Sequence, residues 1–142
     1  MKKLLSIFAL VGLFAFASSA QITTPRFGTT PNKDNTGRVL TYKLIEPAFA
    51  TPYAVVANAY ETTVRIDSLT AAQTLTATVT NCRIADKLTI IFKADTLTAG
   101  RVVTFSTGFV SAGTLTVDKS QKASILFTFD GVKWVETARA KQ

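Results

Sequence analysis

The 142-residue sequence contains no histidine and a single cysteine, Cys82. Without histidine, the chain lacks the commonest general base and the commonest metal ligand, so Ser-triad and zinc chemistry are both disfavoured. One cysteine excludes an internal disulfide framework. We expect Cys82 to be a small buried apolar group, with an intermolecular disulfide as the alternative. We predict no cofactor.

The nine acidic residues are spread singly along the chain. Glycoside hydrolysis needs two carboxylates facing each other across roughly 5–10 Å, and Glu136 with Asp67 or Asp95 is the pairing that we consider. Aspartates at strand ends and turns more often bond their own backbone, which fits Asp67, Asp86, Asp95, Asp118 and Asp130. A calcium site needs clustered oxygen ligands, and the only candidate, residues 32–35, resembles an ordinary turn. We therefore predict no enzyme, no catalytic residues and no metal site.

The formal charge of +7 does not come from a basic patch. Lysines and arginines are scattered, with no run of three, whereas a nucleic-acid binder shows a basic stripe or interleaved aromatic rings. We predict that the basic side chains occupy solvated strand positions and that the protein has no nucleic-acid partner.

The first twenty residues have the pattern of a secretory signal peptide. Lys2 and Lys3 precede residues 4–17, which are apolar apart from Ser6, and small residues follow. A transmembrane helix needs about 20 apolar residues, so an uncleaved anchor is only the alternative. We expect cleavage after Ala20, or else after Ala17; the first leaves residues 21–142 with a charge of +5. The protein is then secreted or on the cell surface, with no membrane contact after cleavage.

Residues 21–37 contain two prolines, two glycines and many threonines. We expect an extended N-terminal arm, which is either disordered or lies across a neighbouring subunit. Residues 38–142 suffice for a single domain. Short alternating stretches separated by turn residues predict an all-β fold, an antiparallel β-sandwich or jelly-roll-like barrel of about eight or nine strands. The expected strands are 38–45, 61–69, 74–80, 87–93, 101–107, 114–117 and the two halves of a hairpin at 124–139, while 53–60 is a strand or a helical turn.

One weak internal repeat occurs within this region. Residues 67–72, DSLTAA, resemble residues 95–100, DTLTAG. Two copies are fewer than the three that a solenoid needs, so we interpret them as two similar turn-plus-strand units.

The hairpin at 124–139 anchors the predicted fold. Asp130-Gly131 stands between two alternating runs and predicts a two-residue type I′ turn. That turn would pair Phe129 with Val132 and Phe127 with Trp134, and would place Ile125 on the same buried face. The complete inward set that we predict adds Leu75, Val79, Leu88, Ile90, Phe92, Val103 and Phe105.

Two kinds of side chain indicate binding surfaces. Tyr42, Tyr53 and Tyr60 are the candidate carbohydrate contacts, because a tyrosine hydroxyl is stable at a surface. Threonines alternate along residues 74–80 on the expected outward face. Soluble monomers usually guard their strands with charge, so an uncharged face favours stacking between copies; O-linked glycosylation is the competing explanation.

Three stretches near the C-terminus form an ordered pattern: ADKLTIIFKAD, RVVTFSTGFVSAGTL and KASILFTFDGVKWVETAR. The last holds Phe127, Asp130, Gly131, Trp134, Glu136 and Arg139. The pattern, over residues 86–139, resembles a β-domain module of bacteriophage fibre and other virion structural proteins. The resemblance implies a non-enzymatic β-domain in a homo-oligomeric, often trimeric, surface appendage. A signal peptide departs from most virion proteins and favours an exported relative or a phage-derived protein displayed outside the cell.

These features predict a non-catalytic, exported structural or adhesive β-domain. We expect it to self-associate, through sheet edges or the arm at 21–37, as a subunit of an extracellular or virion-like appendage. The alternative is a monomeric carbohydrate-binding module that contacts a surface glycan through Tyr42, Tyr53 or Tyr60.

Overall fold

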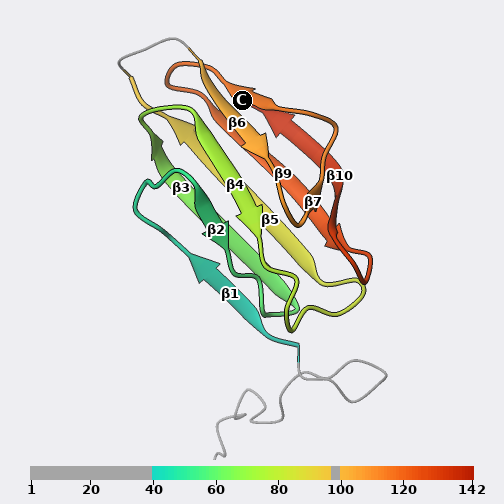
Figure 1. The fold of residues 1–142 in the computed structure, drawn as a ribbon. Coiled ribbons are helices and arrows are strands. Elements are labelled where there is room, and N and C mark those ends of the chain that lie inside the picture. Colours follow the sequence, from blue (N-terminus) through green and yellow to red (C-terminus); the bar gives the residue numbers. More distant parts are fainter. Residues whose placement is uncertain (1–39, 97–99) are drawn as a thin grey trace, which may run out of the picture. The chain divides into compact units, whose positions relative to one another are not determined.

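The computed structural model describes residues 40–96 and 100–142, and these residues form ten strands and no helix (Figure 1). The predicted signal peptide, the arm at 21–37 and the candidate calcium loop at 32–35 lie outside the described residues. The strands are β1 (Tyr42–Ile45), β2 (Tyr53–Val55), β3 (Glu61–Leu69), β4 (Gln73–Ala77), β5 (Lys87–Ala94), β6 (Arg101–Phe105), β7 (Phe109–Val110), β8 (Leu115–Val117), β9 (Lys122–Phe129) and β10 (Trp134–Lys141).

The strands form two mixed sheets, ordered β1-β3-β5-β9-β10-β7 and β2-β4-β6-β8. From β1 to β6 the chain alternates between the two sheets, so that each two successive strands make one coil (Figure 1). Each coil runs in the same direction as the one before it. Because of this repetition, β1, β3 and β5 pair in parallel, as do β2, β4 and β6.

The later strands close both sheets with a different pattern. β8 pairs antiparallel with β6, β9 with β5 and β10 with β9, while β7 pairs in parallel with β10. The predicted all-β fold is therefore confirmed. The predicted antiparallel pairing is wrong for five of the eight strand pairs among the described residues, because strand periodicity does not reveal which sheet the chain enters next. The sequence also missed β7, whose two residues are too few to show alternation.

One cluster of buried apolar side chains joins the two sheets. The six-stranded sheet contributes residues such as Ile90, Phe92 and Phe127, and the four-stranded sheet contributes Leu75 and Val103. Most strands therefore bury one face, at about 1.5–3 kcal/mol per large side chain, whereas β1 has no fully buried residue. The inward residues that are confirmed as buried are Leu75, Leu88, Ile90, Phe92, Val103, Ile125, Phe127, Phe129 and Trp134, and Phe105 packs against them half-buried.

Two predicted inward residues are wrong. Val79 is 43% exposed and Val132 is 70% exposed. Val79 lies two residues beyond the end of β4, where strand alternation no longer fixes the side that a residue faces. Val132 lies in the connection between β9 and β10.

The β9–β10 hairpin has a four-residue connection in place of the predicted two-residue turn. Phe129 pairs with Trp134, and the Asp130 N–H donates to the Lys133 carbonyl at 3.0 Å. The Asp130 carboxylate accepts the N–H groups of Val132 and Lys133, each at 2.7 Å. Gly131 has φ of 108°, a conformation that glycine adopts freely. The carboxylate thus stabilises a longer turn, which shifts the predicted register so that Phe127 pairs with Glu136.

The two similar stretches begin at the ends of successive strands of the six-stranded sheet, with Asp67 near the end of β3 and Asp95 directly after β5. Leu69 pairs with Ala94, and the Asp95 N–H donates to the Leu69 carbonyl at 3.2 Å. The first stretch leads from β3 to β4 and the second from β5 to β6. The similarity therefore marks equivalent crossings between the two sheets.

Gly108 allows a close crossing between β6 and β7. Its φ is +87°, and a Cβ at this position would lie 2.2 Å from the Ala77 carbonyl oxygen. Its own carbonyl accepts the Trp134 N–H at 2.9 Å. Any larger residue would push apart the end of β4 and the segment that enters β7.

Replacement of Trp134 by alanine should destabilise the protein by about 3–5 kcal/mol, because the Trp134 side chain is completely buried in the shared core. Urea unfolding followed by far-ultraviolet circular dichroism measures this loss. Val132→Ala is the matched control, since Val132 is 70% exposed and its truncation should change stability by less than about 0.5 kcal/mol. Coincident curves for Trp134→Ala and the parent would contradict the core assignment.

Candidate functional site

Glu136 and Arg139 form the most elaborate polar cluster in the described residues. The Arg139 Nε and Nη2 donate to the two Glu136 oxygens at 2.5 and 2.7 Å. Glu136 also accepts the Ala112 N–H at 2.8 Å, and Arg139 donates to the carbonyls of Thr114 at 3.1 Å and Gly113 at 3.4 Å. The pair therefore fastens the 111–114 connection to β10.

A β-bulge in β10 makes this pair possible. Residues three apart on a regular strand point to opposite faces, but the β10 register shifts between Glu136 and Ala138. The extra residue lets Glu136 and Arg139 share one face. The bidentate bond from Arg139 and the Ala112 N–H lower the pKa of the Glu136 carboxyl, and Glu136 in turn raises the pKa of Arg139. Both side chains therefore remain charged and paired at neutral pH.

The acids considered for glycoside hydrolysis each bond a different arginine. Asp67 accepts from Arg65 at 2.8 Å, and Asp95 pairs with Arg101 at 2.7 Å, while Glu136 holds Arg139. A facing carboxylate pair would need two acids that share a space, and these three acids are used separately. Across residues 40–96 and 100–142, no group of three or more metal-ligating side chains occurs.

The aspartates expected at turns divide into two groups. The Asp86 carboxylate accepts the Arg83 N–H at 2.8 Å, and Asp130 accepts from Val132 and Lys133, as predicted. The Lys133 N–H, followed by that of Val132, lowers the pKa of the Asp130 carboxyl. The carboxylates of Asp67 and Asp95 pair with the arginine side chains of Arg65 and Arg101.

Trp134 belongs to the core and links the two sheets. Its side chain is fully buried, its ring lies 5.2 Å from that of Phe129, and its indole N–H donates to the Thr78 carbonyl at 3.2 Å. Thr78 follows β4 of the four-stranded sheet, whereas Trp134 begins β10 of the other. The indole N–H therefore has a structural partner, which agrees with the predicted place of Trp134 on the buried face of the hairpin.

The structure brings together two of the three candidate tyrosines. The rings of Tyr42 and Tyr60 lie edge to face, with centroids 6.3 Å apart and planes at 89°. Tyr42 is 65% exposed and Tyr60 is half-buried. Tyr53 lies on β2 of the other sheet and packs against the core, and burial raises the pKa of its phenol. A cluster of all three tyrosines is therefore not present.

An open depression adjoins the Tyr42–Tyr60 pair. It encloses about 440 Å³ and is lined by Tyr42, Lys43, Leu44, Glu61 and Thr63 of β1 and β3. The hydroxyl, ammonium and carboxylate groups on its rim can donate and accept hydrogen bonds. The depression therefore combines one exposed aromatic ring with polar neighbours.

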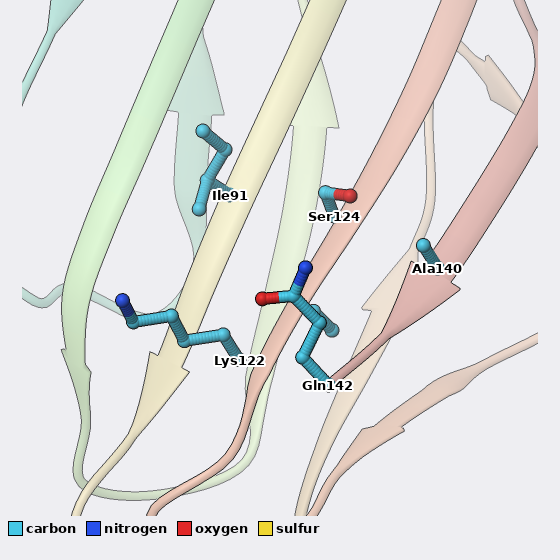
Figure 2. A pocket seen from close by; sticks show the side chains of 6 residues that line it. Ile91, Lys122, Ser124, Ala140 and Gln142 are labelled. Carbon is cyan, nitrogen blue, oxygen red and sulfur yellow. The ribbon is translucent and has the colours of Figure 1, made fainter.

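A smaller hollow lies on the outer side of the six-stranded sheet (Figure 2). Its volume is about 190 Å³, and Ile91, Ser124 and Ala140 form a row across β5, β9 and β10 at its base. Lys122 and Gln142 lie beside this row (Figure 2). Pockets for drug-sized ligands usually measure about 300–1,000 Å³, so this hollow fits at most a very small molecule.

Cys82 is half-buried, and its thiol donates to the Ala57 carbonyl at 3.0 Å. Burial, assisted by the charge of Asp86, raises the pKa of the thiol. Because the thiolate is the reactive form, this environment lowers the reactivity of Cys82. Cys82 packs against the core, but it is half-buried where a buried apolar group was predicted.

The outward positions of the four-stranded sheet carry no charged side chain among the described strands. Thr74 and Thr76, predicted to face outward, lie there on β4. The sequence did not show that this surface continues through Ala54 of β2, Val102 and Thr104 of β6, and Thr116 of β8. The register between strands was needed to join them.

Within the part of the chain that the structure describes, there is no helix that is long and apolar enough to span a membrane. Comparison with protein-family models finds no match for this chain, and comparison with curated proteins also finds none.

Replacement of Glu136 by glutamine should weaken the fold at neutral pH by about 1–2 kcal/mol, through loss of the charged hydrogen bonds to Arg139. The folded pKa of Glu136 lies below its unfolded value, near 4.3. The stabilisation is therefore present above that value and is lost as the pH falls through the folded pKa. Urea unfolding measured from pH 7 to pH 2 should show that the free energies of unfolding of Glu136→Gln and the parent become equal in acid.

Glu46→Gln is the control for this experiment. Glu46 pairs with Arg65 at 3.4 Å, but its side chain is 53% exposed, so the exchange should change little. Equal losses in Glu136→Gln and Glu46→Gln at pH 7 would contradict a special role for the Glu136–Arg139 pair.

Proposed function

We propose that this protein is an exported, non-catalytic structural or adhesive β-domain that self-associates as a subunit of an extracellular or virion-like appendage. The proposal combines the N-terminal signal pattern with the resemblance of residues 86–139 to phage fibre modules. On this view the two sheets act as a sandwich-like scaffold, and the surface and edges of the scaffold provide the binding.

The observation that carries the proposal is the exposed end of the coil. β1 and β2 are the edge strands of their sheets, and both belong to the first coil. Tyr42 and Leu44 on β1 are 65% and 61% exposed. An edge strand presents unpaired backbone groups that another chain can bind, and the segment 21–37 precedes β1 in the sequence, with residues 38–41 between them.

The residues that carry the phage-fibre resemblance also favour a structural role. Trp134, Glu136, Arg139 and Asp130 bond the core, the 111–114 connection and the hairpin turn. Their chemistry is used inside the domain. This supports a scaffold whose function lies in assembly.

The mature protein, residues 21–142, should form an oligomer in solution. Removal of residues 21–37 should weaken the association between its subunits. Light scattering after size exclusion measures the mass of both proteins. A trimer or larger species that dissociates without the segment would support assembly through the arm, and an unchanged oligomer would assign assembly to the sheets. A monomer in both proteins at all concentrations would overturn the proposal.

A second function is favoured by the Tyr42–Tyr60 pair beside the depression on β1 and β3. If the domain binds glycans there, Tyr42→Ala should lower the affinity for a glycan selected on an array by at least tenfold. Tyr53→Phe is the control, because Tyr53 packs against the core of the other sheet. Equal binding by Tyr42→Ala and the parent would remove this site from consideration.

A further inference from the structure

We infer that the outer face of the four-stranded sheet packs against the same face of a second copy of this chain. The inference rests on the proposed self-association and names the surface that serves it. We call this surface the neutral face and define it by six outward positions: Ala54, Thr74, Thr76, Val102, Thr104 and Thr116.

The strand register makes these six positions one continuous surface. Ala54 pairs with Thr76, Thr74 with Thr104, and Val102 with Thr116. The residues between them, such as Leu75 and Val103, are buried in the core. Ala54, Val102 and Thr104 are exposed, and the three other threonines are half-buried. The face is therefore accessible and lined by methyl and hydroxyl groups.

The outer face of the six-stranded sheet has a different character. Its outward positions on β3, β5 and β9 carry six charged side chains: Glu61, Arg65, Asp67, Lys87, Lys93 and Lys122. This face follows the usual pattern of a strand surface in contact with water. The two outer faces thus differ in charge although both belong to the same pair of sheets.

Charge favours a second copy as the partner of the neutral face. The mature chain carries +5 after loss of Lys2 and Lys3, so copies repel one another when charged surfaces meet. None of the six positions carries an ion whose removal from water would be costly; the Asp118 carboxylate lies with Thr116 around Gly100 at the border of the face. An acidic ligand or a nucleic acid would find no cation on this face with which to pair.

The side chains of the neutral face are also complementary to themselves. A threonine hydroxyl both donates and accepts hydrogen bonds, so the same surface can face itself across a two-fold axis. Threonine and valine are stiff at χ1 and lose little conformational entropy when they become ordered. These properties lower the cost of contact between copies.

The size of the neutral face limits how tightly it can bind. Four strands spaced about 4.8 Å apart and up to five residues long cover roughly 300 Å². A stable interface buries about 800 Å² on each partner. The neutral face alone therefore supports an association that depends on concentration, and a permanent oligomer needs a further contribution from the sheet edges or the arm.

The test places a charge of either sign on the neutral face. Thr104→Lys and Thr104→Glu should each raise the dissociation constant of the oligomer at least tenfold. Sedimentation velocity on the mature chain over a concentration series measures this constant. Both signs weaken the contact, because either charge must lose water there. A mixture of the two variants should associate more tightly than either alone, since the same face contributes on both copies.

Thr89→Lys and Thr89→Glu are the matched controls. Thr89 occupies an outward position of β5 on the charged face, and its variants should keep the parent's dissociation constant within twofold. Circular dichroism and thermal unfolding confirm that each variant is folded. If Thr104→Lys does not fold, Ala54→Lys on the edge strand β2 replaces it.

The remaining outcomes overturn the inference in distinguishable ways. If the parent chain is monomeric at every concentration, both the proposed function and this inference are wrong. If the Thr104 variants associate normally, or if the Thr89 variants weaken association equally, the neutral face is not the contact between copies, and the proposed self-association still stands. A mixture no tighter than its components excludes packing of the face on itself. Loss of glycan binding in the Thr104 variants, with self-association intact, would assign the face to glycans.

Discussion

The apolar layer between the two sheets is the constraint on which the rest of the structure depends. A single strand cannot bury its apolar side alone, and a sheet needs a second layer against that side. Here each coil supplies one strand to each sheet, so every crossing adds residues to both sides of the same core. The crossings, the turns and the polar pairs serve to keep the two sheets in contact. Trp134 contributes most directly, because it fills the core from one sheet and bonds the Thr78 carbonyl beside the other.

The polar residues near the C-terminus solve problems that this arrangement creates. The chain must leave the coil after β6, place β7 at the far edge of the six-stranded sheet and return to the other sheet for β8. Glu136 and Arg139 hold the connection at 111–114 that makes this return. Gly108 lies in the earlier connection from β6 to β7 and allows it to pass the end of β4. An ordered sequence motif can thus arise from the geometry of one difficult connection, without any reaction to catalyse.

Much of the local structure followed from the sequence. Alternation located most strands, and the predicted span 61–69 is that of β3. The buried side chains of β5 and β9 were also predicted, because period-two patterns are clear in strands of eight residues. These features depend on near neighbours in the chain, which a single sequence displays.

The features that the sequence did not predict depend on distant parts of the chain. The parallel pairing follows from the alternate crossing between sheets, which strand patterns do not encode. The hairpin register depended on whether Asp130 bonds the N–H of Lys133, a choice between two turns that the same Asp-Gly pair permits. The neutral face was seen only along β4, because its other members lie on strands that become neighbours through the fold. The tyrosine candidates were separated for the same reason, since β1 and β2 belong to different sheets.

The coil also sets the unit in which this chain can change its length. Tyr42 pairs with Glu61 and Glu61 with Lys87, so successive coils contain 19 and 26 residues before the next aligned position. The difference lies mainly in the crossings, because the β1–β3 register is constant and the β3–β5 register shifts by only one residue, between Ile66 and Leu69. Loss or gain of a complete coil therefore leaves the remaining parallel pairs intact, as in other repeating architectures. A change of a few residues within a strand would instead turn its buried side chains toward water. Such a scaffold can evolve to be longer or shorter by whole coils while its closing strands remain the same.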